Sequence, residues 1–233
     1  MFGKIFNPIK SLAKLRIFSP RYTLLCYYFH NYCDFFTTFT LAMILDIHTH
    51  NAQTHAQTID TVGIHPWHAE FCDLAEVELR AASVDAIGEI GLDYACEVPR
   101  EIQMDIFRAQ LALAERLEKP IVLHCVRAFE DVVKVIKEYR LKAVIFHGFI
   151  GSKEQAQRAV SQGYFLSFGE RTFRSPKTIE AMLSTPLSHL FVETDESTTP
   201  IEEIYAKIAE LRGISTVELQ QATEENLKSI LNK

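Results

Sequence analysis

From Met43 to the end of the chain, short apolar runs alternate regularly with segments of helical periodicity. In the helical segments, apolar residues recur every three or four positions, as at Ile102, Ile106, Ala109 and Leu113. The runs are rich in Val, Ile and Phe, which is typical of parallel strands buried on both faces. Seven such runs are present: MILDIH (43–48), DTVGIH (60–65), VDAIGEI (84–90), PIVLHC (120–125), KAVIFH (142–147), GYFLSF (163–168) and SHLFVE (188–193).

This alternation predicts an α/β fold with a parallel sheet and crossover helices. The sequence has no GxGxxG or Walker loop after a strand, which excludes the usual nucleotide sites of open sheets. We therefore predict a TIM-type (β/α) barrel. Seven strands and 191 residues fall just short of the eight strands and ~200 residues of a full barrel, so we expect it to be shortened or incomplete. The missing strand and helix would belong between His50 and Asp60, where the chain is too short for them, unless part of residues 1–42 fills that position.

The first 42 residues differ from the rest of the chain in composition. They hold five of the 24 basic residues and one of the 30 acidic residues, which leaves 19 basic and 29 acidic residues in 43–233. Their aromatic-rich stretch shows no clear period, and His30, Asn31 and Asp34 interrupt it well short of the ~20 apolar residues of a membrane span. We expect 1–42 to be a poorly defined extension and 43–233 to be the barrel domain, with Met43 a candidate start of translation.

The cellular setting follows from the same segment and from the cysteines. No A-x-A-like cleavage site follows the basic and aromatic residues of 1–42, which argues against a signal peptide. The five cysteines are irregularly spaced and include no CxxC pair, so neither a disulfide framework nor a zinc–cysteine cluster is indicated. We expect a cytoplasmic protein without a membrane anchor.

Metal-ligand side chains stand where several predicted strands end. His48 and His50 are two residues apart in an extended run, so both side chains point to the same side. Any one such residue is as well explained by hydrogen bonding or helix capping. In a barrel, however, the carboxyl ends of all strands meet at one mouth. Six residues would meet there: His48, His50, Glu89, His124, His147 and Asp195.

Four imidazoles and two carboxylates are too many ligands for one tetrahedral zinc ion. They suit two divalent cations that share a bridging carboxylate, with positions left for water and substrate. Imidazole with carboxylate accommodates Zn or Mn, and Mg is suited to an oxygen-rich side. We therefore predict two divalent ions, Mg, Mn or Zn, and the residue types do not choose among them.

With these motifs the sequence resembles the TatD family of metal-dependent hydrolases, within the amidohydrolase superfamily. The resemblance covers nearly all of 43–233 and none of 1–42. Its most specific parts are the HxH opening and GEIGLDY. The matching stretches run in order: DIHTHN (46–51), GIHPW (63–67), GEIGLDY (88–94), FRAQLALAERLEKPIVLHCVRA (107–128), FHGFIGS (146–152), SFG (167–169) and ETD (193–195).

The resemblance implies a two-metal phosphodiesterase, typically a deoxyribonuclease that acts from a DNA end. Asp195 would also take a proton from the attacking water, and His65 would face the substrate phosphate, so Glu89, Asp195 and His65 are the expected catalytic residues. Arg127 would bind another phosphate oxygen. The implied ligands are His48, His50 and Asp195 for one ion, His124 and His147 for the other, and Glu89 as the bridge.

Two departures from the family pattern leave the substrate open. The strand and helix after the HxH stretch are missing, and the loop after ETD is shortened to ESTTP (196–200). Because the body of the chain is acidic, we expect the cations themselves to attract DNA, as a single strand or an end. The alternatives are a hydrolase of amides, lactones or D-aminoacyl esters and a metal-binding barrel without catalysis. Arginine or lysine in the pocket would favour phosphodiesters, and an apolar pocket the other bonds.

Overall fold

A computed structural model describes residues 44–51 and 55–231. Strands and helices alternate along these residues, as the apolar pattern predicts. The strands are β1 (Thr61–Val62), β2 (Ala86–Asp93), β3 (Ile121–Val126), β4 (Val144–Phe146), β5 (Phe165–Phe168) and β6 (Leu190–Val192). The α-helices are α1 (Leu74–Ala81), α2 (Arg100–Arg116), α3 (Phe129–Ile136), α4 (Lys153–Ser161), α5 (Pro176–Ser184), α6 (Ile201–Arg212) and α7 (Thr216–Leu231). Three 3-10 helices complete the set: η3 (Pro66–Phe71), η4 (Glu170–Arg174) and η5 (Leu187–His189).

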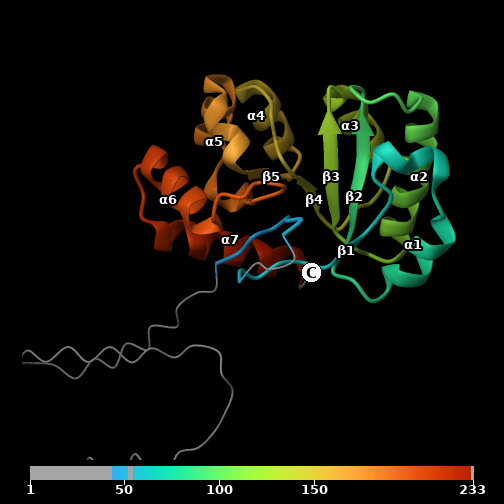
Figure 1. The fold of residues 1–233 in the computed structure, drawn as a ribbon, viewed down its shortest axis with the longest axis horizontal. Helices are drawn as coiled ribbons and strands as arrows, with labels where there is room; N and C mark the ends of the chain where they lie inside the picture. Colours follow the sequence, from blue (N-terminus) through green and yellow to red (C-terminus); the bar gives the residue numbers. More distant parts are fainter. Residues whose placement is uncertain (1–43, 52–54, 232–233) are drawn as a thin grey trace, which may run out of the picture. The chain divides into compact units, whose positions relative to one another are not determined.

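The six strands form one parallel sheet in sequence order, β1-β2-β3-β4-β5-β6. Each of the six predicted runs from residue 60 onward overlaps one of these strands, and β2 and β3 extend beyond their runs to Asp93 and Val126. The helices between the strands cover the outside of the sheet (Figure 1). Together with the structural relatives described below, this arrangement confirms the predicted TIM-type fold in a shortened form.

The segment 44–50 joins the two edges of this sheet. It forms isolated parallel bridges, through Leu45 to Gln57 just before β1 and through Thr49 to Asp195 just after β6. The first predicted strand is therefore extended but forms no continuous ladder, and the sheet is not closed by regular strand pairing. The question whether residues 1–42 complete the barrel lies outside the described residues.

Two apolar cores lie on the two faces of the sheet. The outer core packs the helices against side chains such as Ile87, Leu123 and Phe146. The inner core fills the barrel, and Leu227 and Ile230 of α7 belong to it, so α7 covers the end at which the strands begin. The rest of the inner core consists of Leu45, Ile47, Ile59, Ala86, Val122, Ala143, Ile145, Phe165 and Phe191.

The positions of the inner-core residues show which side chains point toward the mouth of the barrel. Successive residues of a strand alternate between faces, so the residue two positions after an inner-core residue also points inward. His124 follows Val122 in this way, and His147 follows Ile145. Because the strand starts are covered by α7, these polar side chains lie at the opposite, carboxyl ends of the strands.

Local signals explain where several helices begin and end. Ser152 and Gln155 form a capping box at the start of α4, and Gly213 ends α6 in the left-handed conformation with φ 66°. Ser215 Oγ accepts a hydrogen bond from the Glu218 backbone N–H at 3.1 Å, at the start of α7. Among the helices of the described part of the chain, none combines the length and the apolar character that crossing a membrane requires.

Candidate metal centre

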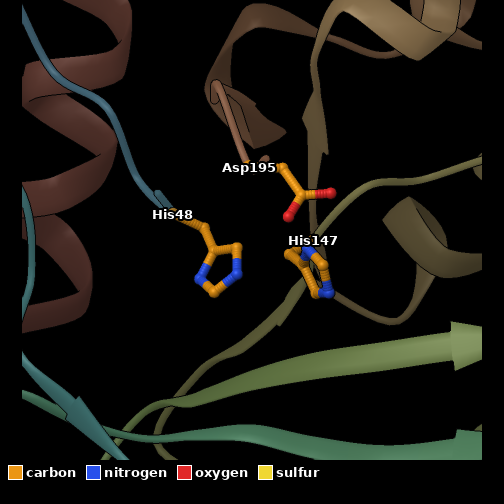
Figure 2. A group of neighbouring side chains, drawn as sticks. All are labelled: His48, His147 and Asp195. Carbon is orange, nitrogen blue, oxygen red and sulfur yellow. The ribbon is translucent and has the colours of Figure 1, made fainter. Parts of the chain in front are cut away.

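The six predicted ligand residues come together at the mouth of the barrel. Figure 2 shows His48, His147 and Asp195, from three separate segments of the chain, with their side chains directed toward one another. One ligand atom from each of these three lies within 4.8 Å of the others. The same holds for two further groups, His48 with His50 and Glu89, and His65 with Glu89 and His124.

Glu89 is at the centre of the cluster. The pairing of β2 with β3 shifts between Ile87 and Ile90, which both face the outer core, and the extra residue of this bulge lets Glu89 turn inward. Its Oε1 lies 2.7 Å from His124 Nδ1 and within hydrogen-bonding distance of His147 Nε2. Burial alone would raise the pKa of Glu89, but the hydrogen bonds from these two histidines hold it well below its usual range. Glu89 is therefore an anion.

The histidines of the first segment approach the other oxygen of the same carboxylate. His48 Nε2 lies 3.4 Å from Glu89 Oε2, and His50 Nε2 lies 3.7 Å from it. His50 Nε2 is also 3.7 Å from Asp195 Oδ1. The two histidines that the HxH spacing places on one side thus approach one oxygen of the Glu89 carboxylate, and His124 approaches the other.

His65 belongs to the same cluster. Its Nδ1 accepts a hydrogen bond from the Trp67 backbone N–H at 3.2 Å and caps η3, while its Nε2 lies 3.6 Å from Glu89 Oε1. Burial and the neighbouring His124 lower the pKa of His65 to about 4, so the ring is neutral. Because Nδ1 accepts a hydrogen bond, the proton of the neutral ring is on Nε2, so the nitrogen directed into the site is a hydrogen-bond donor.

Asp195 has an unusual backbone position. Its φ of 54° lies in the left-handed region, which Asp tolerates better than most residues. Its backbone N–H donates to the His48 carbonyl, and its own carbonyl accepts from the His50 N–H, both at 3.0 Å. Burial and the nearby Glu193 raise the pKa of Asp195 above its usual value, so this carboxylate holds a proton more readily than an exposed one.

Two more carboxylates stand behind the histidines. Asp93 Oδ2 lies 3.1 Å from His124 Nε2, and Glu193 Oε1 lies 3.8 Å from His147 Nδ1. Carboxylates in this position orient ligand imidazoles and fix which nitrogen carries the proton. Burial would lower the pKa of His147, but Glu193 and Glu89 raise it to about 10, so a cation bound at this ring has to displace a proton.

The residues present fit divalent cations. Within residues 44–51 and 55–231, the buried His48 Nε2 has no hydrogen-bond partner although it points into the cluster. Leaving a buried polar atom unpaired costs about 1–3 kcal/mol, and coordination would remove that cost. The donors are imidazole nitrogens and carboxylate oxygens, as Zn²⁺ and Mn²⁺ prefer.

A cavity of about 810 Å³ opens above the cluster. Its walls include Trp67 and Ile150, which are 53% and 61% exposed, and two arginines, Arg127 and Arg171. Arg127, the predicted phosphate-binding residue, lies in this wall. Arg171 was not predicted, because RTFR carries no motif and only the fold brings it to the mouth.

Residues 34–232 match the sequence model of a family described as TatD related DNase. This match begins nine residues before Met43, and the domain boundary at 42/43 stays a prediction. A Bacillus subtilis protein named uncharacterized metal-dependent hydrolase YabD is 36% identical over 178 residues, covering 68% of this chain and 70% of that protein. The 3'-5' ssDNA/RNA exonuclease TatD of Erwinia tasmaniensis is 31% identical over 202 residues, covering 74% and 77%.

Solved structures give the same relationship. The crystal structure of YjjV, a TatD homologue from Escherichia coli, superimposes with a TM-score of 0.69 at 30% identity and covers 76% of this chain and 77% of that one. A TatD family hydrolase from Entamoeba histolytica superimposes with a TM-score of 0.67 at 20% identity, covering 77% and 76%, and supports the fold alone.

Proposed function

The chain belongs to the TatD family of metal-dependent hydrolases, and from this premise we propose that it hydrolyses the phosphodiester bonds of DNA with two divalent ions. The preferred substrate is a single strand, attacked from an end. The observation that carries the proposal is the Glu89 carboxylate, approached by five imidazoles at the mouth of a cavity with two arginines in its wall.

The candidate ligands form two sets, one for each cation. In the proposed arrangement, His48, His50 and Asp195 would hold one ion, and His124 and His147 would hold the other. Glu89 touches both sets of histidines and is suited to bridge them. Bound divalent ions lower the pKa of a water molecule and neutralise charge on a phosphate.

Three residues are assigned to proton transfer from the attacking water and to binding of the substrate phosphates. Asp195 takes the proton of the attacking water, a role that its raised pKa suits. His65, neutral and with Nε2 directed into the site, faces the phosphate. Arg127 is exposed at the edge of the cavity and binds a further phosphate oxygen through its planar guanidinium.

The cavity favours phosphodiesters over amides, lactones or D-aminoacyl esters. Arg127 and Arg171 are the arginines of its wall, and a guanidinium matches the geometry of phosphate oxygens. The formal net charge of the chain is −6, so local cations and bound metal must attract a polyanion. The name of the Erwinia relative, an exonuclease of single-stranded DNA and RNA, supports the same substrate class.

A nuclease assay on matched variants tests the proposal. The purified chain, loaded with Mn²⁺ or Mg²⁺, should shorten a single-stranded oligonucleotide from one labelled end. Glu89→Ala should abolish this activity while its thermal unfolding still shows a folded protein. Glu225→Ala, which removes an exposed carboxylate from α7 at the other end of the barrel, should keep it. Full activity in Glu89→Ala, or hydrolysis of lactones or amides without any of DNA, would contradict the proposal.

A further inference from the structure

Arg171 stands at the junction of two cavities. It lines the 810 Å³ cavity above the cluster and a neighbouring cavity of about 280 Å³. Its Nη1 lies 3.9 Å from Asp195 Oδ2 and its Nη2 lies 3.6 Å from Glu196 Oε2, distances too long for hydrogen bonds. Its side chain is 61% exposed, so its donors are accessible to a ligand beside the candidate proton acceptor.

The backbone around Arg171 is anchored on both sides. Glu170 Oε2 accepts hydrogen bonds from Ser197 Oγ and, at 3.2 Å, from Thr199 Oγ1, which ties η4 to the short loop after β6. On the other side, the Thr172 backbone N–H donates to the Gly169 carbonyl at 3.0 Å. Only the side chain of Arg171 therefore has to adjust when a ligand binds, which lowers the entropic cost of holding that ligand.

The neighbouring arginine of η4 is not free in the same way. Arg174 Nη2 donates to Glu170 Oε1 at 2.6 Å, so its charge is already paired. The other charged residues that line the smaller cavity are four acids, Glu170, Glu193, Asp195 and Glu196. The binding of an anion at the entrance of this cavity therefore depends on Arg171.

Arg127 stands at a second junction, between the large cavity and a third cavity. Arg127 lines the large cavity and also a third one of about 360 Å³, to which Lys177 contributes another positive charge. Ile150, 61% exposed, lies in the walls of all three cavities, which therefore adjoin one another. Five of the six candidate metal ligands, all except His48, line the central cavity, and an arginine marks its boundary with each neighbour.

We propose that Arg171 is a specificity-determining residue that holds the phosphate next to the scissile one, at a different boundary of the central cavity from Arg127. The substrate is then a strand with several phosphates rather than a single diester. This inference rests on the proposed function, because it assumes that the scissile phosphate lies at the metal ligands. It goes further by assigning a residue to the neighbouring phosphate.

Binding of an uncleavable oligonucleotide tests the inference independently of catalysis. The probe is a fluorescein-labelled single-stranded oligothymidylate with phosphorothioate linkages, and the protein is the full chain loaded with Mn²⁺. Arg171→Met should weaken binding by about tenfold and reduce the salt slope by about 0.7, since one cation no longer meets a phosphate. Arg171→Lys should lie between wild type and Arg171→Met, because lysine keeps the charge without the fork. Arg80→Met, an exposed arginine of α1, is the matched control and should bind as wild type does.

A neutral phosphate identifies the contact itself. One methylphosphonate linkage, placed next to the expected scissile position, should weaken binding to wild type as much as Arg171→Met does. In Arg171→Met, the same linkage should cause no further loss of binding affinity, because the two changes remove the same interaction. Affinity of Arg171→Met within twofold of wild type, or additive losses at every linkage, would overturn the inference.

A kinetic ratio separates this inference from the proposed function. For wild type and Arg171→Met, kcat/KM is measured on the oligothymidylate with ordinary linkages and on bis(p-nitrophenyl) phosphate, a diester with one phosphate. The oligonucleotide-to-diester ratio should fall by about tenfold in Arg171→Met, and an unchanged ratio would overturn the inference. A wild type that hydrolyses neither compound removes the proposed function, and the binding measurements then decide the role of Arg171 alone.

Discussion

A substitution of Asp93 would change the surroundings of the metal centre without replacing a candidate ligand. Its side chain is buried, and its Oδ2 accepts from Trp67 Nε1 at 2.7 Å while lying 3.1 Å from His124 Nε2. Burial would raise its pKa, but the hydrogen bonds from Trp67 and from the Ala95 backbone lower it. An ionised Asp93 is suited to accept the proton of His124 Nε2, so that Nδ1, which faces Glu89, is the nitrogen that would bind a cation.

Asp93→Asn removes this arrangement at almost constant volume. The amide oxygen can still accept from the Ala95 N–H, but the amide nitrogen then faces the Trp67 N–H and His124 Nε2 as a donor. Losing the acceptor for a buried indole should lower the free energy of unfolding by about 1–3 kcal/mol. Nδ1 of His124 would now carry the proton, so metal affinity should fall about 10–100-fold, equivalent to about 1.4–2.8 kcal/mol.

Isothermal titration of the metal-free protein with Mn²⁺ or Zn²⁺ measures the affinity, and thermal unfolding measures the stability. Asp85→Asn is the matched control: Asp85 is exposed directly before the start of β2, and its Oδ2 accepts a backbone hydrogen bond from Asp60 at 2.9 Å. The control should bind metal as wild type does. Metal affinity of Asp93→Asn within twofold of wild type would refute the assigned role of Asp93.

Gly91→Ala should lower the free energy of unfolding by about 4 kcal/mol or more, because a Cβ there would lie 2.0 Å from the His124 carbonyl oxygen at φ 145°; a melting temperature within two degrees of wild type, roughly 0.5 kcal/mol, would contradict this. Tyr205→Phe removes the hydroxyl that donates to the Leu45 carbonyl at 2.8 Å, and denaturant unfolding should show a loss of about 1–3 kcal/mol. An unaltered unfolding midpoint would show that this bond does not hold the first segment in place. With free metal at a hundred times its dissociation constant, adding excess chelator should lower the free energy of unfolding by about 2.7 kcal/mol. Identical melting curves with and without chelator would argue against metal in the folded site.

The sequence pattern predicts the sheet because each strand is buried on both faces, so apolar runs mark the strands directly. The exception is the run before His50, whose backbone pairs only at Leu45 and Thr49. Apolar character alone does not distinguish such a segment from a ladder strand. Both kinds of segment bury their side chains, and only the partners of the backbone differ.

The candidate metal ligands could be brought together from the sequence because they lie late in the apolar runs or just after them, and the carboxyl ends of these runs meet at one mouth. Arg171 could not, because its role depends on Gly169 and the shortened loop after β6, which bring η4 against the site. Asp93 lies in a matching motif, but its contact with His124 depends on the register of β2 with β3, in which Gly91 pairs with His124. Such contacts follow from tertiary packing rather than from local spacing.

Anomalous X-ray scattering from crystals grown with Mn²⁺ locates the cations themselves. The site described here should give two peaks about 3.5–4 Å apart, both within coordination distance of Glu89, one beside His48 and the other beside His124. Peaks only elsewhere on the molecule, or no peak beside Glu89, would contradict a metal centre built from these imidazoles and carboxylates.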